Sequence, residues 1–187
     1  MEAASNLSTL VTIIFGLMLT DLFASVHKLI RGRSRVRWHW LPILVSWYVL
    51  AMVLKNWWGL VFEEGAGIWG SGWVFFYYAH LLLLLYLVAS ATLPDEIPAE
   101  GLDLREFYLD NRRQFWGLMA GVSLILLAYS LLRPAFTAST VNWAAVISNA
   151  VLGAITLSLA WTRRMSYHAV FVLLLTTLTI IEIVVKF

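Results

Sequence analysis

The chain has 187 residues, of which 61% are hydrophobic and 13% are charged, and its mean hydropathy is +0.80. Because a typical soluble domain has about 25% charged and 45–50% apolar residues, this composition excludes a soluble globular domain and indicates a polytopic membrane protein. The formal net charge of +2 comes from basic residues that cluster in short loops, so we expect no nucleic-acid partner. Cysteine is absent, which excludes disulfides, thiolate metal sites and a cysteine nucleophile.

A helix that spans the hydrocarbon core of a bilayer needs about 20 mostly apolar residues. Six segments meet this condition, at residues 7–30, 39–62, 72–93, 114–133, 141–161 and 167–186. The segment Met1–Asn6 lacks the basic region and the small-residue cleavage site of a signal peptide, so we expect the first span to be retained. Because backbone groups in lipid must be satisfied within helices, we predict an all-α fold, a single integral membrane domain over residues 1–187 that is a bundle of six transmembrane helices.

The basic residues between the spans predict the orientation of this bundle. The first connection, Lys28–Arg37, contains five basic residues and no acidic one, whereas the second, Glu63–Gly72, contains two acidic residues and no basic one. Further arginines lie in or beside the third and fifth connections, at Arg105, Arg112, Arg113, Arg163 and Arg164. By the positive-inside rule, these three odd-numbered connections face the cytoplasm and both termini face the non-cytoplasmic side. Tryptophans near both ends of the spans agree with this orientation.

The third connection leads into a polar segment, residues 103–114, ahead of the fourth span. Asp103 and Glu106 have the spacing of a capping box, with an acceptor before the first turn and a carboxylate three residues later. Apolar residues then recur at helical spacing, which predicts a cytoplasmic amphipathic extension of the fourth span, with Arg112 and Arg113 at the level of the lipid phosphates. Two interpretations stay open: a helix that lies at the lipid interface, or a docking site for a partner.

Four ionisable residues lie inside the apolar spans: Asp21, Lys55, His80 and Glu182. A charge at the bilayer centre costs roughly 2.5–3.5 kcal/mol, so these residues should face each other, the bundle interior or water. With a rise of about 1.5 Å per residue, Lys55 and Glu182 both lie about 21–24 Å from the cytoplasmic surface. Either they form an interhelical ion pair, or Glu182 pairs with Lys186 on its own helix while Lys55 reaches the outer interface.

Asp21 and His80 fall nearer the middle of their spans, at heights that agree within one helical turn. A contact between them has two interpretations, a proton relay or a structural hydrogen bond. A relay is chemically reasonable because burial raises the pKa of an aspartate while a cationic neighbour lowers it, and because histidine titrates near neutral pH.

Three histidines near the cytoplasmic boundary are candidate metal ligands, together with carboxylates of the third connection: His27, His39, His168, Asp103, Glu106 and Asp110. Imidazole and carboxylate groups suit zinc or iron. The histidines show no known ligand spacing, however, so we expect no metal and no other cofactor. The sequence also lacks the nucleophile-elbow, P-loop and dinucleotide-binding motifs, which disfavours an enzyme.

Several stretches resemble a family of small bacterial inner-membrane proteins without an assigned activity. The resemblance is carried by Ile14–Leu17 with Thr20–Leu22, Arg35–Arg37, Asn56–Trp58, Asp103–Arg105, Tyr108 and Asn111–Trp116. It implies a multi-pass protein of the bacterial cytoplasmic membrane and does not indicate a substrate.

Buried charges at matched depth favour an oligomeric channel or small transporter that passes ions or protons along a path lined by Asp21, His80, Lys55 and Glu182. A homo-oligomer is expected because six helices in 187 residues leave little room for a rocking mechanism within one subunit. The alternative is a non-transporting membrane subunit or scaffold that recruits a cytoplasmic protein or anionic lipid. Its candidate contact residues are Arg35, Arg37, Asp103, Glu106, Arg112 and Arg113.

Overall fold

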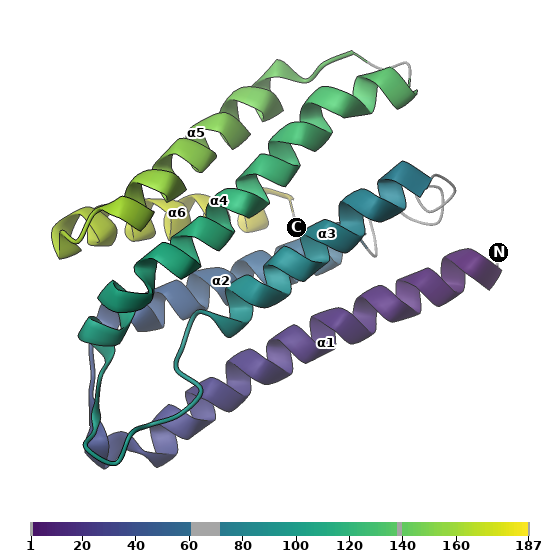
Figure 1. Ribbon diagram of the computed structural model, residues 1–187. Helices are drawn as coiled ribbons and strands as arrows, with labels where there is room; N and C mark the ends of the chain where they lie inside the picture. Colours follow the sequence, from purple (N-terminus) through teal and green to yellow (C-terminus); the bar gives the residue numbers. More distant parts are fainter. Residues whose placement is uncertain (1, 61–71, 138–139, 187) are drawn as a thin grey trace.

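The computed structural model describes residues 2–60, 72–137 and 140–186, and this part of the chain is almost entirely helical (Figure 1). Its helices are α1 (Glu2–Arg31), α2 (Trp40–Trp58), α3 (Gly72–Ser90), α4 (Leu104–Thr137), α5 (Trp143–Trp161) and α6 (Met165–Lys186). A short 3-10 turn, η1 (Arg33–Arg35), and two strands, β1 (Val36–Arg37) and β2 (Leu102–Asp103), lie between them.

The six helices are each long and apolar enough to cross a bilayer, so the prediction of six spans is confirmed at the level of length and composition. The fourth helix includes the amphipathic extension that the sequence predicted ahead of its span. It begins at Leu104, because the amphipathic segment 104–114 continues into the apolar segment without a break. The polar segment and the fourth span are therefore one helix.

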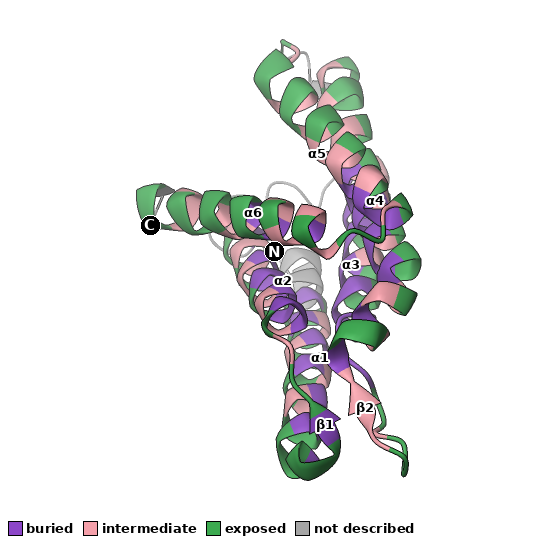
Figure 2. Cartoon of the chain, turned by 90° about the vertical axis from the view of Figure 1, so that its left-hand side faces the viewer, coloured by how far each residue is buried: buried purple, intermediate pink, exposed green. Residues whose placement is uncertain are grey.

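Neighbouring helices run antiparallel, but the last helix leaves its sequence neighbour (Figures 1 and 2). The helices α4 and α5 form a closely packed hairpin, and α3 packs between α4 and α1. By contrast, α6 diverges from α5 and packs mainly on α2. This crossing places residues of α6 opposite residues of α2 that are more than a hundred positions earlier in the chain.

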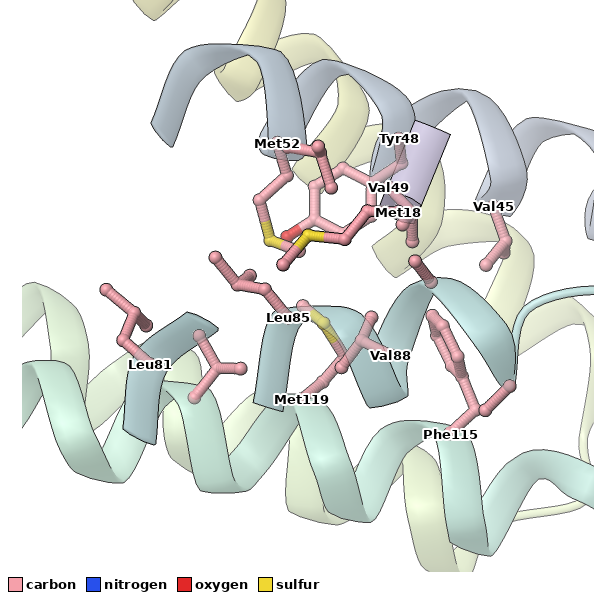
Figure 3. Packing of buried hydrophobic residues seen from close by; sticks show 14 of the residues in the cluster. Met18, Val45, Tyr48, Val49, Met52, Leu81, Leu85, Val88, Phe115 and Met119 are labelled. Carbon is pink, nitrogen blue, oxygen red and sulfur yellow. The ribbon is translucent and has the colours of Figure 1, made fainter. Parts of the chain in front are cut away.

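The core of the bundle is formed by the apolar faces of the first four helices, with contributions from α5 and α6. Figure 3 shows Met18 of α1, Val49 of α2, Leu85 of α3 and Met119 of α4 packed together. These side chains are at most 1% exposed. They form an apolar layer that comes from the middle of the four helices.

At one end, β1 and β2 pair in parallel, with Val36 opposite Leu102 and Arg37 opposite Asp103. This small sheet, which the sequence analysis did not predict, ties the first connection to the third. Gly101, just before β2, has a φ of +104°, and a Cβ atom there would lie 3.0 Å from the carbonyl oxygen of Arg35. We call this end of the bundle the sheet end.

Candidate functional site

An ion pair joins α2 and α6 at the end of the bundle opposite the sheet. The Nζ atom of Lys55 lies 2.7 Å from Oε2 of Glu182, and the two side chains are 30% and 40% exposed. The structure thus contains the interhelical pair, which was one of the two arrangements open from sequence. The other arrangement involved Lys186, whose side chain lies outside the described residues. The pair forms because α6 packs on α2 with both charges at the same height.

Two adjoining cavities meet at this ion pair. Their volumes are about 410 and 420 Å³. Both are lined by Lys55, Asn56, Leu126, Asn149 and Glu182. We call the two cavities and their lining side chains the polar chamber. The chamber is lined by residues of α2, α3, α4, α5 and α6.

Hydroxyl and amide groups complete the polar lining of the chamber. The first cavity adds Tyr77, Tyr78, Tyr129 and Ser130, and the second adds Tyr48, Ser123, Ser148 and Thr179. Within this lining, the Nδ2 atom of Asn149 donates to Oγ of Ser130 at 3.2 Å. The Nδ2 atom of Asn56 donates to the carbonyl oxygen of Met52 at 2.8 Å. The chamber therefore offers both charges and neutral donors and acceptors to a small polar solute.

An aromatic cluster forms one wall of the chamber. The rings of Tyr77 and Tyr129 stack with centroids 4.1 Å apart, and Tyr78 meets Tyr77 edge-on at 4.7 Å. Trp73 packs against Tyr129 from the start of α3, and the guanidinium carbon of Arg133 lies 5.7 Å from the centre of the Tyr129 ring. These contacts hold α3 against α4 beside the cavity.

A second polar cluster is buried near the sheet end, between α4 and α6. The hydroxyl of Tyr108 lies 2.7 Å from Nδ1 of His168, and Nε1 of Trp116 donates to the same hydroxyl at 3.0 Å. The other ring nitrogen, Nε2 of His168, lies 3.1 Å from the carbonyl oxygen of Thr162. Trp116 and His168 are fully buried and Tyr108 is 4% exposed.

One neutral tautomer of His168 satisfies this whole cluster. With the proton on Nε2, the imidazole donates to the carbonyl of Thr162 and accepts the hydroxyl proton of Tyr108, whose oxygen accepts from Trp116. A doubly protonated ring would leave the Tyr108 hydroxyl proton without this acceptor. From sequence, His168 was expected at the cytoplasmic boundary, and its buried cluster was not predicted. The available signal was Tyr108 and Trp116 on one apolar face, because buried aromatic donors require a polar partner.

The chamber and the histidine cluster lie along one face of α6. Glu182 and His168 are fourteen residues apart, which corresponds to about 21 Å along the helix axis. Between them, the buried face of α6 carries Val172 and Leu175. Two titratable side chains, Glu182 and His168, are therefore separated by apolar residues on the same face of α6.

Asp21 and His80 do not form the contact that their matched heights predicted. His80 is exposed, and its Nδ1 lies 2.7 Å from the carbonyl oxygen of Phe76 in the preceding turn of its own helix. Asp21 is half-buried and has no hydrogen bond or ion pair to any described residue. The expectation was wrong because depth fixes height but not direction around the helix axis. The buried face of α3 contains Leu81, Leu82 and Leu85, so residue 80 points away from the bundle.

The three candidate metal-binding histidines lie in separate environments. His27 is exposed on α1. His39 caps α2, and its Nδ1 accepts from the backbone N–H of Leu41 at 3.3 Å. Both nitrogens of His168 are used in the buried cluster. Across the described ranges, no group of three or more histidine, cysteine or acidic side chains is arranged to hold a metal ion.

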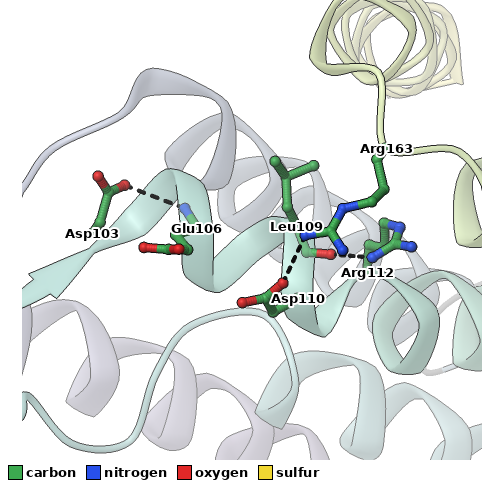
Figure 4. Close-up of polar contacts among 6 residues, drawn as sticks. All are labelled: Asp103, Glu106, Leu109, Asp110, Arg112 and Arg163. Atoms are coloured by element: carbon green, nitrogen blue, oxygen red, sulfur yellow. Dashed lines mark hydrogen bonds and ion pairs between the residues drawn. The ribbon is translucent and has the colours of Figure 1, made fainter.

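Asp103 organises the start of α4 at the sheet end. Its Oδ1 accepts from the backbone N–H groups of Arg105 at 2.9 Å and Glu106 at 3.2 Å, as the predicted N-cap requires (Figure 4). Its Oδ2 lies 3.3 Å from Nη1 of Arg37. The hydrogen bond from Glu106 holds the pKa of Asp103 below its ordinary value, and the charge of Arg37 adds to this effect. Arg35 and Arg37 themselves are exposed.

The arginines that follow behave differently from each other. Arg112 was expected at the lipid phosphates, but it is only 6% exposed and donates through Nη1 to the carbonyl oxygen of Leu109 (Figure 4). The reason is that α4 turns this position toward the bundle. Arg113, one residue later, is exposed. Asp110 pairs at 3.0 Å with Arg163 of the fifth connection.

Comparisons with protein-family models, curated proteins and solved structures gave no match to this chain.

Proposed function

We propose that this chain is a small multi-pass channel or transporter of the bacterial inner membrane, that it works as an oligomer, and that it passes ions or protons through the polar chamber. In this proposal both termini are on the non-cytoplasmic side and the sheet end faces the cytoplasm. The observation that carries it is the Lys55–Glu182 ion pair, which is partly exposed where two cavities meet.

The energetics of this pair favour a role in conduction over a role in packing alone. Ionisable residues inside membrane spans are costly and line ion or proton pathways far more often than they face lipid. Replacing a buried ion pair by apolar residues is often neutral or stabilising, so helix packing by itself does not require these charges. Both charges also remain partly exposed to the cavities, where an entering ion can reach them.

A step of conduction follows from the pair's geometry. A cation or a proton that binds Glu182 removes its attraction for Lys55, and this weakens the contact between α2 and α6. The next titratable group along α6 is His168, beyond the apolar Val172 and Leu175. The proposed path therefore runs from Glu182 towards His168 and Tyr108. It leaves out the expected Asp21–His80 step, since those side chains do not meet.

The test is ion and proton flux into proteoliposomes under both polarities of pH and voltage. The variants are Glu182→Gln and Lys55→Gln, and the matched control is Glu106→Gln, which neutralises an exposed carboxylate outside the chamber. We expect flux in the wild type and in Glu106→Gln and a large loss in the two chamber variants. Equal flux in the wild type and Glu182→Gln would contradict the proposal.

A second candidate, a scaffold, is favoured by the sheet end. Pairing of β1 with β2 fixes the first connection beside the start of α4, and Arg31, Arg33, Arg35 and Arg37 are all exposed there. Such a fixed basic surface suits an acidic protein or anionic lipid. Absence of flux in the wild type, together with a co-purifying protein that is lost in an Arg35→Glu, Arg37→Glu variant, would favour this candidate.

A further inference from the structure

A groove runs along the outside of the α4–α5 hairpin near the sheet end. Its volume is about 410 Å³, and it is lined by Arg113 and Gly117 of α4 and by Leu157, Ala160 and Trp161 of α5. This volume falls within the range of roughly 300–1,000 Å³ for small-ligand sites. We propose that the groove binds an anionic phospholipid, with the headgroup phosphate on Arg113 and an acyl chain along the apolar floor.

The order of the lining residues matches the order of groups in a phospholipid. Arg113 and Gly117 are one turn apart on α4, and Trp161 and Leu157 are one turn apart on α5. The charged and aromatic residues thus lie at the sheet end, and the apolar residues follow toward the middle of the bundle. Exposed tryptophan is typical of the membrane interface, and Trp161 is 73% exposed.

Gly117 makes room for the acyl chain. A Cβ atom built at this position would meet no other atom within 4 Å, so the space above it is open. The opposite wall, Leu157, is 47% exposed and faces the same space. A larger side chain at position 117 therefore fills the groove without a clash at its Cβ.

Charge at the groove rim selects an anionic lipid over a zwitterionic one. Arg113 lines the groove, and the charges of Arg113 and Arg163 both act on the neighbouring Arg112. Asp110 is the acidic partner, and it pairs with Arg163. The guanidinium of Arg113 has no partner within the described part of the chain, and neither has the buried Nε atom of Arg112. The cluster consequently carries an excess of positive charge at the level where lipid phosphates lie.

A lipid fits these observations better than a free anion or a second copy of the chain. Four of the five lining residues are apolar or glycine, so inorganic phosphate would contact Arg113 and leave the floor uncovered. A second copy would bring its own basic cluster against this one if the contact were symmetric, and like charges would oppose it.

The experiment is native mass spectrometry of the full chain released from nanodiscs that contain equal amounts of phosphatidylglycerol and phosphatidylcholine. Arg113→Gln removes the rim charge, and Arg105→Gln removes an exposed arginine from the same helix outside the groove. Gly117→Leu fills the floor, and Leu157→Trp fills it from the opposite wall. Thermal melting in phosphatidylcholine nanodiscs checks that each variant is folded.

We expect wild-type protein and Arg105→Gln to retain phosphatidylglycerol selectively. Arg113→Gln should weaken its binding about fivefold, since one arginine near a membrane surface contributes about that much. Both groove-filling variants should lose the retained lipid. Equal weakening by Arg113→Gln and Arg105→Gln would overturn the proposal, and so would unchanged lipid retention in a folded groove-filling variant. Displacement of the lipid by inorganic phosphate alone would overturn it in favour of a free anion. A change of oligomeric state in Gly117→Leu with lipid retention unaffected would overturn it in favour of a second copy of the chain.

Discussion

Lys55 and Glu182 are 127 residues apart in the chain, yet their side chains form an ion pair with a Nζ–Oε2 distance of 2.7 Å. The contact joins α2 to α6, which are not sequence neighbours and which pack together because α6 leaves α5. The pair is thus both a structural link between two helices and the charged centre of the polar chamber. These two roles make different predictions for the same substitutions.

The structural role is tested by a charge exchange. Glu182→Gln leaves Lys55 without its counter-ion, and we expect a loss of about 1–3 kcal/mol, less than for a fully buried pair because both side chains are partly exposed. The exchange Lys55→Glu, Glu182→Lys should recover most of this stability. Unfolding of the purified protein in mixed micelles, analysed as a double-mutant cycle, measures the coupling. A coupling near zero would show that the ion pair does not hold α2 to α6.

The histidine cluster predicts a large effect of one hydroxyl group. In Tyr108→Phe, the buried Trp116 and His168 each lose a hydrogen-bond partner, so we expect a loss of about 1–3 kcal/mol in the free energy of unfolding. The matched control is Tyr167→Phe, which removes a hydroxyl that contacts Ser158 at 2.8 Å in a half-buried place near the same end. The control should cost clearly less. Equal losses in the two variants would mean that the cluster has no special contribution to stability.

The number of spans was predictable because a bilayer permits few solutions. Each segment must be helical over about 20 residues, and hydropathy reports that length directly. Counting residues along these helices also predicted the height of Lys55 and Glu182. Opposite charges at one height in a membrane span lower their cost by pairing with each other. The same counting failed for Asp21 and His80. His80 precedes a run of five leucines, Leu81–Leu85, so the sequence contains no periodic signal for which face of α3 is buried.

The remaining features depend on contacts between distant segments. The two strands are two residues each, too short for an alternating pattern, and they pair only because the first and third connections come together. The contact of Tyr108 with His168 requires α6 to cross toward α4 near the sheet end, and no local pattern specifies that crossing. The open groove at Gly117 likewise depends on how α5 lies against α4.

Gly101 should be difficult to replace. Its φ of +104° is a conformation that other residues adopt at a cost, and a Cβ atom would lie 3.0 Å from the carbonyl oxygen of Arg35. We expect Gly101→Ala to destabilise the sheet end by about 1–2 kcal/mol. The control is Gly16→Ala in α1, where a Cβ atom meets nothing within 4 Å and helix propensity improves. Hydrogen exchange of the β1 and β2 amides should rise in the first variant only. Unchanged exchange in Gly101→Ala would show that the backbone at this position adapts without loss.

Asp103 predicts a defined pH dependence at the sheet end. The folded protein lowers its pKa, mainly through the hydrogen bond from the backbone of Glu106, so the charged carboxylate stabilises the folded state. That contribution is fully present above the ordinary pKa of 3.8 and is lost as the pH falls through the lower value in the folded protein.

The measurement compares the wild type with Asp103→Asn and Asp103→Ala. The amide of Asp103→Asn can still cap α4, so its deficit should reflect the missing charge and should shrink as the pH falls below about 4. Asp103→Ala also removes the cap, and it should retain a deficit of about 1 kcal/mol at every pH. Exchange of the Arg105 and Glu106 amides, followed from pH 3 to pH 7, reports the cap directly. A deficit in Asp103→Asn that is independent of pH would contradict the proposed electrostatic contribution. Such a deficit would not depend on whether the Asp103 carboxylate is charged.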